Sequence, residues 1–232
     1  MAKWLLDAGH GGTDPGACYK GRRECDDTLR LTKRVGEILK ANGETVEYIR
    51  TTDTTVSLSQ RSQKENAGSY DYFVSLHRNA FNPEQAKGVE TYIYNGSYAS
   101  KEKNRSFATK VNTALINGGG YYNRGVKEAN YHVLRETKCP AILIEVGFID
   151  NTGDNSIFDN KFESIAQSIA KGCLEQVGKS MSTITSTTTA TTSGDTYYRV
   201  IVGSYKDKNN AIKQQEALKA KGFDSFLEAF KK

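Results

Sequence analysis

The stretch Leu5-Leu6-Asp7-Ala8-Gly9-His10-Gly11-Gly12 joins an apolar strand to a glycine-rich loop. Glycine permits positive φ and a close approach of the backbone, so this loop presents His10 at the tip of the strand. A histidine in such a place serves either as a metal ligand or acid–base group, or as a residue that merely closes a turn. Its neighbours in the fold decide between these roles.

Two other apolar runs carry a polar residue at an equivalent position. His77 follows YFVSL at residues 72–76, and Glu145 lies within AILIEVG at residues 141–147. A buried parallel strand is usually apolar throughout, and an unpaired buried carboxylate is costly. Because ligands of open α/β sheets gather at the carboxyl ends of the strands, we expect His10, His77 and Glu145 to converge there. Two histidines and a carboxylate suit zinc.

Length and composition indicate a water-soluble α/β core with a small appendage. The chain has 232 residues, of which 25% are charged and 37% hydrophobic. No run approaches the ~20 apolar residues of a membrane span, so we expect no membrane insertion. The apolar run at the N-terminus is too short for a signal peptide, which predicts a product made in the cytoplasm.

The four cysteines form no Cys-x-x-Cys pair and are expected to be reduced thiols; they are Cys18, Cys25, Cys139 and Cys173. Cys25, beside Glu24, is the one cysteine in a position to become an accidental metal ligand. The net charge is +5, and from Thr196 onward eight Lys/Arg face four Asp/Glu. This basic tail suits an anionic partner such as the cell wall, or is a solvated surface. Without a recognition motif it does not indicate nucleic-acid binding.

A helix is expected from about residue 22 to 41, with Glu24 at its start. Acidic residues are common there because they favour the helix dipole, and Glu24 is alternatively a third zinc ligand. Further along we expect a strand at 45–50, a helix opened by the capping box of Ser57 and Gln60, and a strand at 88–94. A helix at 101–117, a loop holding 124–127, a strand at 131–134 and a helix at 164–177 follow.

These alternating elements predict an α/β fold, with a mostly parallel twisted sheet covered by helices on both faces. Residues 1–178 form this domain, and the Ser/Thr-rich segment 179–196 has the composition of a flexible linker. Residues 197–232 predict a small βαβ unit, with strands at 197–205 and 223–230 around a helix at 209–220.

Four motifs in order resemble the zinc-dependent N-acetylmuramoyl-L-alanine amidases of the amidase-3 family: LLDAGHGGTDPGA, RRE at 22–24, SLHRNA at 75–80 and YHVLRETKCPAILIEVGFID at 131–150. The resemblance implies that His10, Glu24 and His77 hold Zn²⁺ and that Glu145 is the catalytic glutamate. The tail resembles a SPOR peptidoglycan-binding module through YYRVIVGSYKDKNNA and ALKAKGFDSF, although it supplies about half of the usual βαββαβ unit. The arrangement is similar to mother-cell-lysis amidases of spore formers and to phage endolysins.

The expected reaction is hydrolysis of the amide between the N-acetylmuramoyl lactyl group and L-alanine, with peptidoglycan as the substrate. Asn79, Arg124 and His132 are candidates for binding the muramoyl peptide; Asn79 and Arg124 are alternatively solvated residues, and His132 a half-exposed strand residue. Competing hypotheses are a zinc peptidase that cuts within the stem peptide and a non-catalytic wall-binding protein. We also expect pairing of two tails into a homodimer, and action on the wall after release by a holin or by mother-cell lysis.

Overall fold

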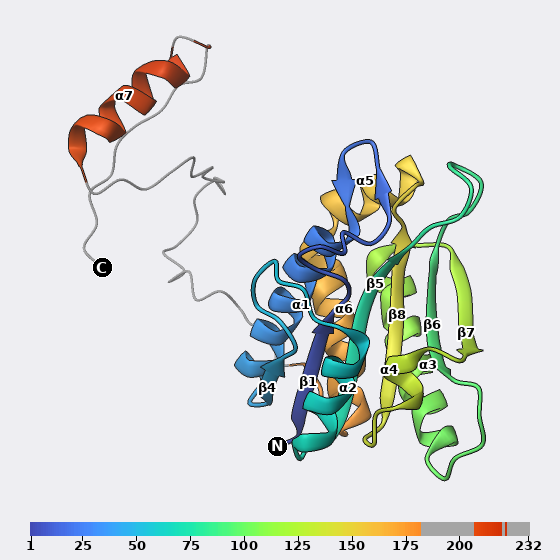
Figure 1. Ribbon diagram of the computed structural model, residues 1–232. Coiled ribbons are helices and arrows are strands. Elements are labelled where there is room, and N and C mark those ends of the chain that lie inside the picture. Colours follow the sequence, from blue (N-terminus) through green and yellow to red (C-terminus); the bar gives the residue numbers. More distant parts are fainter. Residues whose placement is uncertain (182–206, 220, 222–232) are drawn as a thin grey trace, which may run out of the picture. The chain divides into compact units, whose positions relative to one another are not determined.

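The computed structural model describes residues 1–181, 207–219 and 221, and the chain divides into two units, Met1–Thr183 and Ile184–Lys232. The first unit is built on a six-stranded sheet (Figure 1). Its order is β4 (Thr45–Tyr48), β1 (Lys3–Ala8), β5 (Tyr72–Asn79), β8 (Ala141–Phe148), β6 (Val89–Tyr94) and β7 (Asn123–Ala129).

The first four strands of this order are parallel, whereas β6 runs antiparallel to β8 and β7 runs parallel to β6. The expected mostly parallel α/β sheet is therefore confirmed, with a reversed pair at one edge. The reversal follows from the short connection 80–88 between β5 and β6. Parallel strands need a crossover of about a dozen residues or more, so a shorter segment returns the chain in the opposite direction.

One face of the sheet is covered by three long helices, α1 (Glu24–Ala41), α3 (Lys101–Gly119) and α6 (Phe162–Gln176). The other face carries the shorter α2 (Leu58–Ala67) and α4 (His132–Arg135), which lie in front of the sheet in Figure 1. Strand residues alternate between the two: Trp4 and Leu6 enter the larger core, and Leu5 enters the smaller one.

This alternation determines the face on which the chemistry-bearing residues lie. Asp7 follows Leu5 by two residues, His77 follows Phe73 by four, and Glu145 follows Leu143 by two. All three therefore share the face covered by α2 and α4. Because each is near the carboxyl end of its strand, they gather at one end of this less covered face.

Several local expectations are corrected by the structure. Residues 124–127 lie in strand β7 rather than a loop; β7 is a half-exposed edge strand, so it lacks a clear hydrophobic alternation. Residues 131–134 are not a strand, because His132 begins the single turn α4. Val133 and Leu134 are both buried, and adjacent residues of a strand would point to opposite faces.

Three short elements were not expected. The loop after β1 contains a small hairpin of β2 (Cys18–Tyr19) and β3 (Arg22–Arg23), and α5 (Thr152–Asn160) follows β8. The signal for α5 was Asn151, whose side chain caps the helix by accepting a hydrogen bond from the Asp154 backbone. The capping box of Ser57 and Gln60 at the start of α2 is confirmed.

In the second unit the structure describes helix α7 (Lys208–Lys219), close to the helix expected at 209–220. The expected strands at 197–205 and 223–230, and residues 182–196 of the expected linker, lie outside the described residues. The start of that segment packs on the first unit: Lys179 forms an ion pair with Glu44, and Met181 contacts the larger core.

We expect Gly172→Ala to destabilise the first unit, although alanine is the better helix former by ~1 kcal/mol. A Cβ at Gly172 of α6 would lie 2.5 Å from the Val111 Cα of α3, so the two helices would have to separate. Such overpacking costs about 1–3 kcal/mol. Thermal or urea unfolding measures the change, with exposed Lys171→Ala on the same helix as the control. A stability equal to or above that of the wild type would contradict this account of the helix contact.

Candidate metal centre

The loop that carries His10 is held by two arginines. Arg50 donates to the carbonyls of Ala8 and Gly9, and Arg61 donates to the carbonyls of Ala8 and His10, over distances of 2.8–2.9 Å. Arg61 also forms a buried ion pair with Asp7. These bonds fix a backbone in which His10 itself has a φ of 60°, an uncommon conformation for a residue other than glycine.

Glu24, at the first position of α1, lies between the two histidines. Its Oε2 is 3.1 Å from His10 Nε2, and its Oε1 is 2.9 Å from His77 Nδ1. The same oxygens accept hydrogen bonds from the backbone amides of Ala17 and Arg78. Burial by itself would raise the pKa of Glu24, but the two histidines hold that pKa well below its usual range. Glu24 is therefore an ionised carboxylate.

The two imidazoles are positioned from opposite sides. His10 Nδ1 lies 2.8 Å from the Asp14 carboxylate, which leaves Nε2 to face Glu24. Burial opposes protonation of His10, yet Glu24 and Asp14 together raise its pKa to about 9. His77 fits because residue 9 is glycine: a Cβ there would lie 2.3 Å from the His77 ring.

The set of His10, Glu24 and His77 fits a zinc ion. One ligand atom from each residue lies within 4.8 Å of the others, and two nitrogens with one carboxylate oxygen match a three-ligand zinc site. Cys25, Asp26 and Asp53 form a second close group, but Arg23 already pairs with both aspartates. Burial also raises the pKa of Cys25, which disfavours the thiolate that a metal requires.

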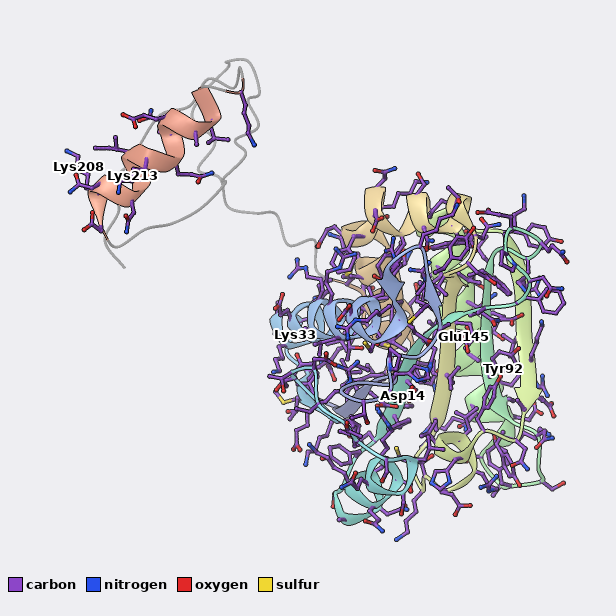
Figure 2. The ribbon with its side chains drawn as sticks, turned by 45° about the horizontal axis from the view of Figure 1, so that its top comes forward. Asp14, Lys33, Tyr92, Glu145, Lys208 and Lys213 are labelled. Atoms are coloured by element: carbon purple, nitrogen blue, oxygen red, sulfur yellow. The ribbon has the colours of Figure 1, made fainter. Side chains whose placement is uncertain are left out.

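Glu145 lies beside this group on β8, directly opposite His77 of β5. Figure 2 shows it at the centre of the sheet, near Tyr92 on the neighbouring strand. The residue is only 9% exposed, and its Oε2 has no hydrogen-bond partner among the described residues. Burial is the main cause that raises the pKa of Glu145 to about 7. The structure therefore places a second carboxylate, whose pKa is close to neutral pH, next to the group of His10, Glu24 and His77.

The three candidate substrate contacts separate into two groups. Asn79 and Arg124 both donate hydrogen bonds to the buried carboxylate of Glu90. His132 instead contacts the Ser62 hydroxyl of α2 at 3.1 Å. Sequence reasoning missed Glu90 and Lys127, which form an ion pair. The available signal for Glu90 was the one that marked Glu145, a carboxylate within a strand.

Fold and site together define a class: an enzyme with a mostly parallel α/β sheet, whose candidate metal centre lies at the carboxyl ends of parallel strands. The chain belongs to the N-acetylmuramoyl-L-alanine amidase family, whose profile matches residues 5–175. A SPOR domain profile matches residues 174–227, beginning earlier than the expected tail. The protein is thus a peptidoglycan amidase, as the motifs predicted.

Relatives match over nearly the whole chain. It is 36% identical to the sporulation-specific N-acetylmuramoyl-L-alanine amidase of Bacillus subtilis, covering 98% of this chain and 84% of the relative. It is 34% identical to the amidase CwlM of Bacillus licheniformis, covering 98% and 85%. The crystal structure of an N-acetylmuramoyl-L-alanine amidase from Clostridium difficile 630 superposes with a TM-score of 0.72 at 32% identity, covering 76% of this chain and 97% of that one.

The protein acts on the cell wall, and no helix within residues 1–181 or 207–219 is long and apolar enough to cross a membrane.

We expect the zinc affinity of the metal-free protein to rise with pH. A zinc-bound imidazole must be unprotonated at the ligating nitrogen, and the raised pKa of His10, about 9, means that metal must displace a proton at neutral pH. Between about pH 8 and pH 6 the apparent affinity should fall by at least ~100-fold, which is tenfold per unit for one proton. Competition with a chelator of known pH dependence measures this change.

Asp14→Asn is a second test of the same explanation, because it removes one of the two carboxylates that raise the pKa of His10. In this variant the pH dependence should begin at a lower pH. An affinity that does not change between about pH 6 and pH 8 would contradict the assignment of His10 as a ligand.

Proposed function

We propose that the chain is a zinc-dependent amidase in which His10, Glu24 and His77 hold the metal and Glu145 transfers the proton. The observation that carries this proposal is the pair of buried carboxylates: one shared between two imidazoles, and one beside them with an unpartnered oxygen. The bond cleaved joins the N-acetylmuramoyl lactyl group to L-alanine, as the family's name states.

Each residue then has a defined task. When bound, zinc supplies a Lewis acid that polarises a carbonyl and lowers the pKa of water. Asp14 keeps the Nε2 atom of His10 directed at the site, and the ionised Glu24 supplies negative charge to it. Glu145 takes a proton from the attacking water and delivers it to the nitrogen of the departing L-alanine.

The environment of Glu145 suits both halves of this task. A general base that later acts as an acid works best with a pKa near the working pH, and burial raises the pKa of Glu145 to about 7 before any metal is bound. Its Oε2 is buried and accepts no hydrogen bond from any described protein donor, so it keeps its capacity to accept a proton.

Glu145→Gln should retain zinc and lose amidase activity by about 10²–10⁴-fold, because the amide has the same shape but accepts no proton. Zinc content is measured by metal analysis, and activity by the appearance of new N-terminal alanine in wall digests. Removal of zinc from the wild type by a chelator should also abolish activity, and added zinc should restore it.

The fold of Glu145→Gln should be at least as stable as the wild type above about pH 7. A pKa raised in the folded state means that ionised Glu145 costs stability there, and glutamine removes this cost. Activity within threefold of the wild type would move the base elsewhere, and loss of zinc would make Glu145 a ligand. Peptides released without N-terminal alanine would favour the stem-peptide peptidase instead.

For the domain organisation we propose a catalytic domain at 1–178, a linker at 179–196 and a wall-binding unit at 197–232. The end of the amidase match at residue 175 and the division of the chain after Thr183 lie on either side of the first boundary. The tail at 197–232 is shorter than ~40 residues, the length below which single domains usually need disulfides, metals or oligomerisation to fold. This favours the pairing of two tails into a homodimer.

The similarity to a sporulation-specific relative supports action on the wall after mother-cell lysis, in preference to holin-mediated release. In either route, the basic tail would concentrate the enzyme on anionic wall material.

A fragment ending at Lys179 should fold, remain monomeric and cleave soluble muramoyl peptides, but lyse intact walls more slowly than the full chain. The loss should be largest at low salt, where screening of the basic tail is weakest. Light scattering over a dilution series should detect a concentration-dependent dimer of the full chain only. Equal wall lysis at every salt concentration would refute targeting by the tail, and a dimer that persists in the fragment would refute pairing through it.

A further inference from the structure

The metal centre is one end of a row of side chains that crosses three adjacent strands. His77 of β5 is directly opposite Glu145 of β8, and Glu145 is directly opposite Glu90 of β6. Residues opposite each other share one face of a sheet, so the row continues from the candidate ligand through the candidate base to Glu90. The next strand, β7, carries Arg124 and Lys127.

Glu90 is a buried carboxylate that fixes both cations. It is 2% exposed; its Oε1 accepts hydrogen bonds from Asn79 and Tyr92, and its Oε2 accepts from Arg124 Nε at 2.8 Å and contacts Lys127. Two positive charges thus face one negative charge. Arg124 and Lys127 together therefore carry one more positive charge than the Glu90 carboxylate neutralises.

This surplus charge faces an open hollow of about 610 Å³. Arg124, Lys127 and Lys87 line it together with Glu90, so cations outnumber carboxylates on its wall. The side chains of Arg124 and Lys127 are 30% and 37% exposed. The Arg124 guanidinium also packs 4.9 Å from the centre of the Phe148 ring, which holds it in place.

Arg124 keeps donors that Glu90 does not use. Its Nε is used by Glu90, and no acceptor among the described residues bonds to its two terminal nitrogens. Glu90 holds the Arg124 guanidinium at Nε, and the Phe148 ring packs against it. The edge with the two terminal nitrogens is therefore positioned to bind a carboxylate. Lys127 adds a second donor on the same side.

We propose that Arg124 and Lys127, positioned by Glu90, bind a carboxylate of the acidic residue that follows L-alanine in the stem peptide. This inference rests on the proposed function. The lactyl carboxylate is consumed in the scissile amide and N-acetylated sugars are uncharged, so the carboxylates near the bond lie on the peptide. Neighbouring strands are ~4.8 Å apart, which places β7 ~10 Å from β8. One extended residue of the peptide covers ~3.5 Å of this distance. The long side chain of Arg124, which extends from β7, covers the rest.

The test compares N-acetylmuramoyl-L-alanyl-D-glutamate with its α-amide, its γ-amide and its diamide as substrates of the zinc-loaded full chain. We expect kcat/KM for the diamide to be lower by about tenfold or more, because a charge-assisted contact is lost. The monoamide that shows the same loss identifies which carboxylate is bound.

Arg124→Gln and Lys127→Gln should each bring the ratio of kcat/KM for the diacid and the diamide towards one. Lys127→Arg, which keeps the charge, should preserve the ratio. Lys33→Gln is the matched loss of one positive charge at an exposed position of α1, labelled in Figure 2, and should also preserve it. Circular dichroism and zinc content confirm that each variant is folded and loaded; because the ratio is internal to each variant, a general loss of activity does not alter it.

Equal kcat/KM for the diacid and the diamide in the wild type would overturn the subsite and leave the amidase function standing. A ratio that is unchanged in both glutamine variants would also overturn it. Cleavage of none of the four substrates by the wild type would overturn the proposed function, and this inference with it.

Discussion

The site depends on one buried interaction, the Glu24 carboxylate shared by two imidazoles. Burying a charge is expensive unless it is paired and hydrogen-bonded, and Glu24 meets this requirement with His10, His77 and two backbone amides. These partners come from the loop after β1, from β5 and from the approach to α1. The same carboxylate that suits a metal therefore also ties together the segments that form the site.

Two buried carboxylates of the same site are held in different states by their partners. Glu24 has four donors around it and remains ionised, whereas Glu145 has one oxygen without a described partner and its pKa rises to about 7. Separation of pKa values in this way distinguishes a ligand from an acid–base group. The difference arises from local hydrogen bonding, since both residues are glutamates in the same small region.

The reversed edge of the sheet, formed by β6 and β7, places further charged residues beside Glu145. If β6 had continued the parallel order, its residues would not be in the antiparallel register that sets Glu90 opposite Glu145. Its partner β7 then supplies two cations to Glu90 on the less covered face of the sheet. The large core under α1, α3 and α6 supports the sheet from one side, and the face with the two short helices has the smaller core.

The sequence by itself determined the α/β class, the strand that leads to His10, the strands that carry His77 and Glu145, and the capping box at Ser57. These features depend on local periodicity and on turn residues, which act within a few positions. The resemblance to a family changed the interpretation of Glu24 from a common helix-start residue to a candidate metal ligand. Only the tertiary structure joined Glu24 to both histidines, placed Arg124 in an edge strand and turned residues 132–135 into a helix. It also brought Glu90 beside Glu145, because cross-strand register is set by pairing between distant segments, which local sequence patterns do not encode.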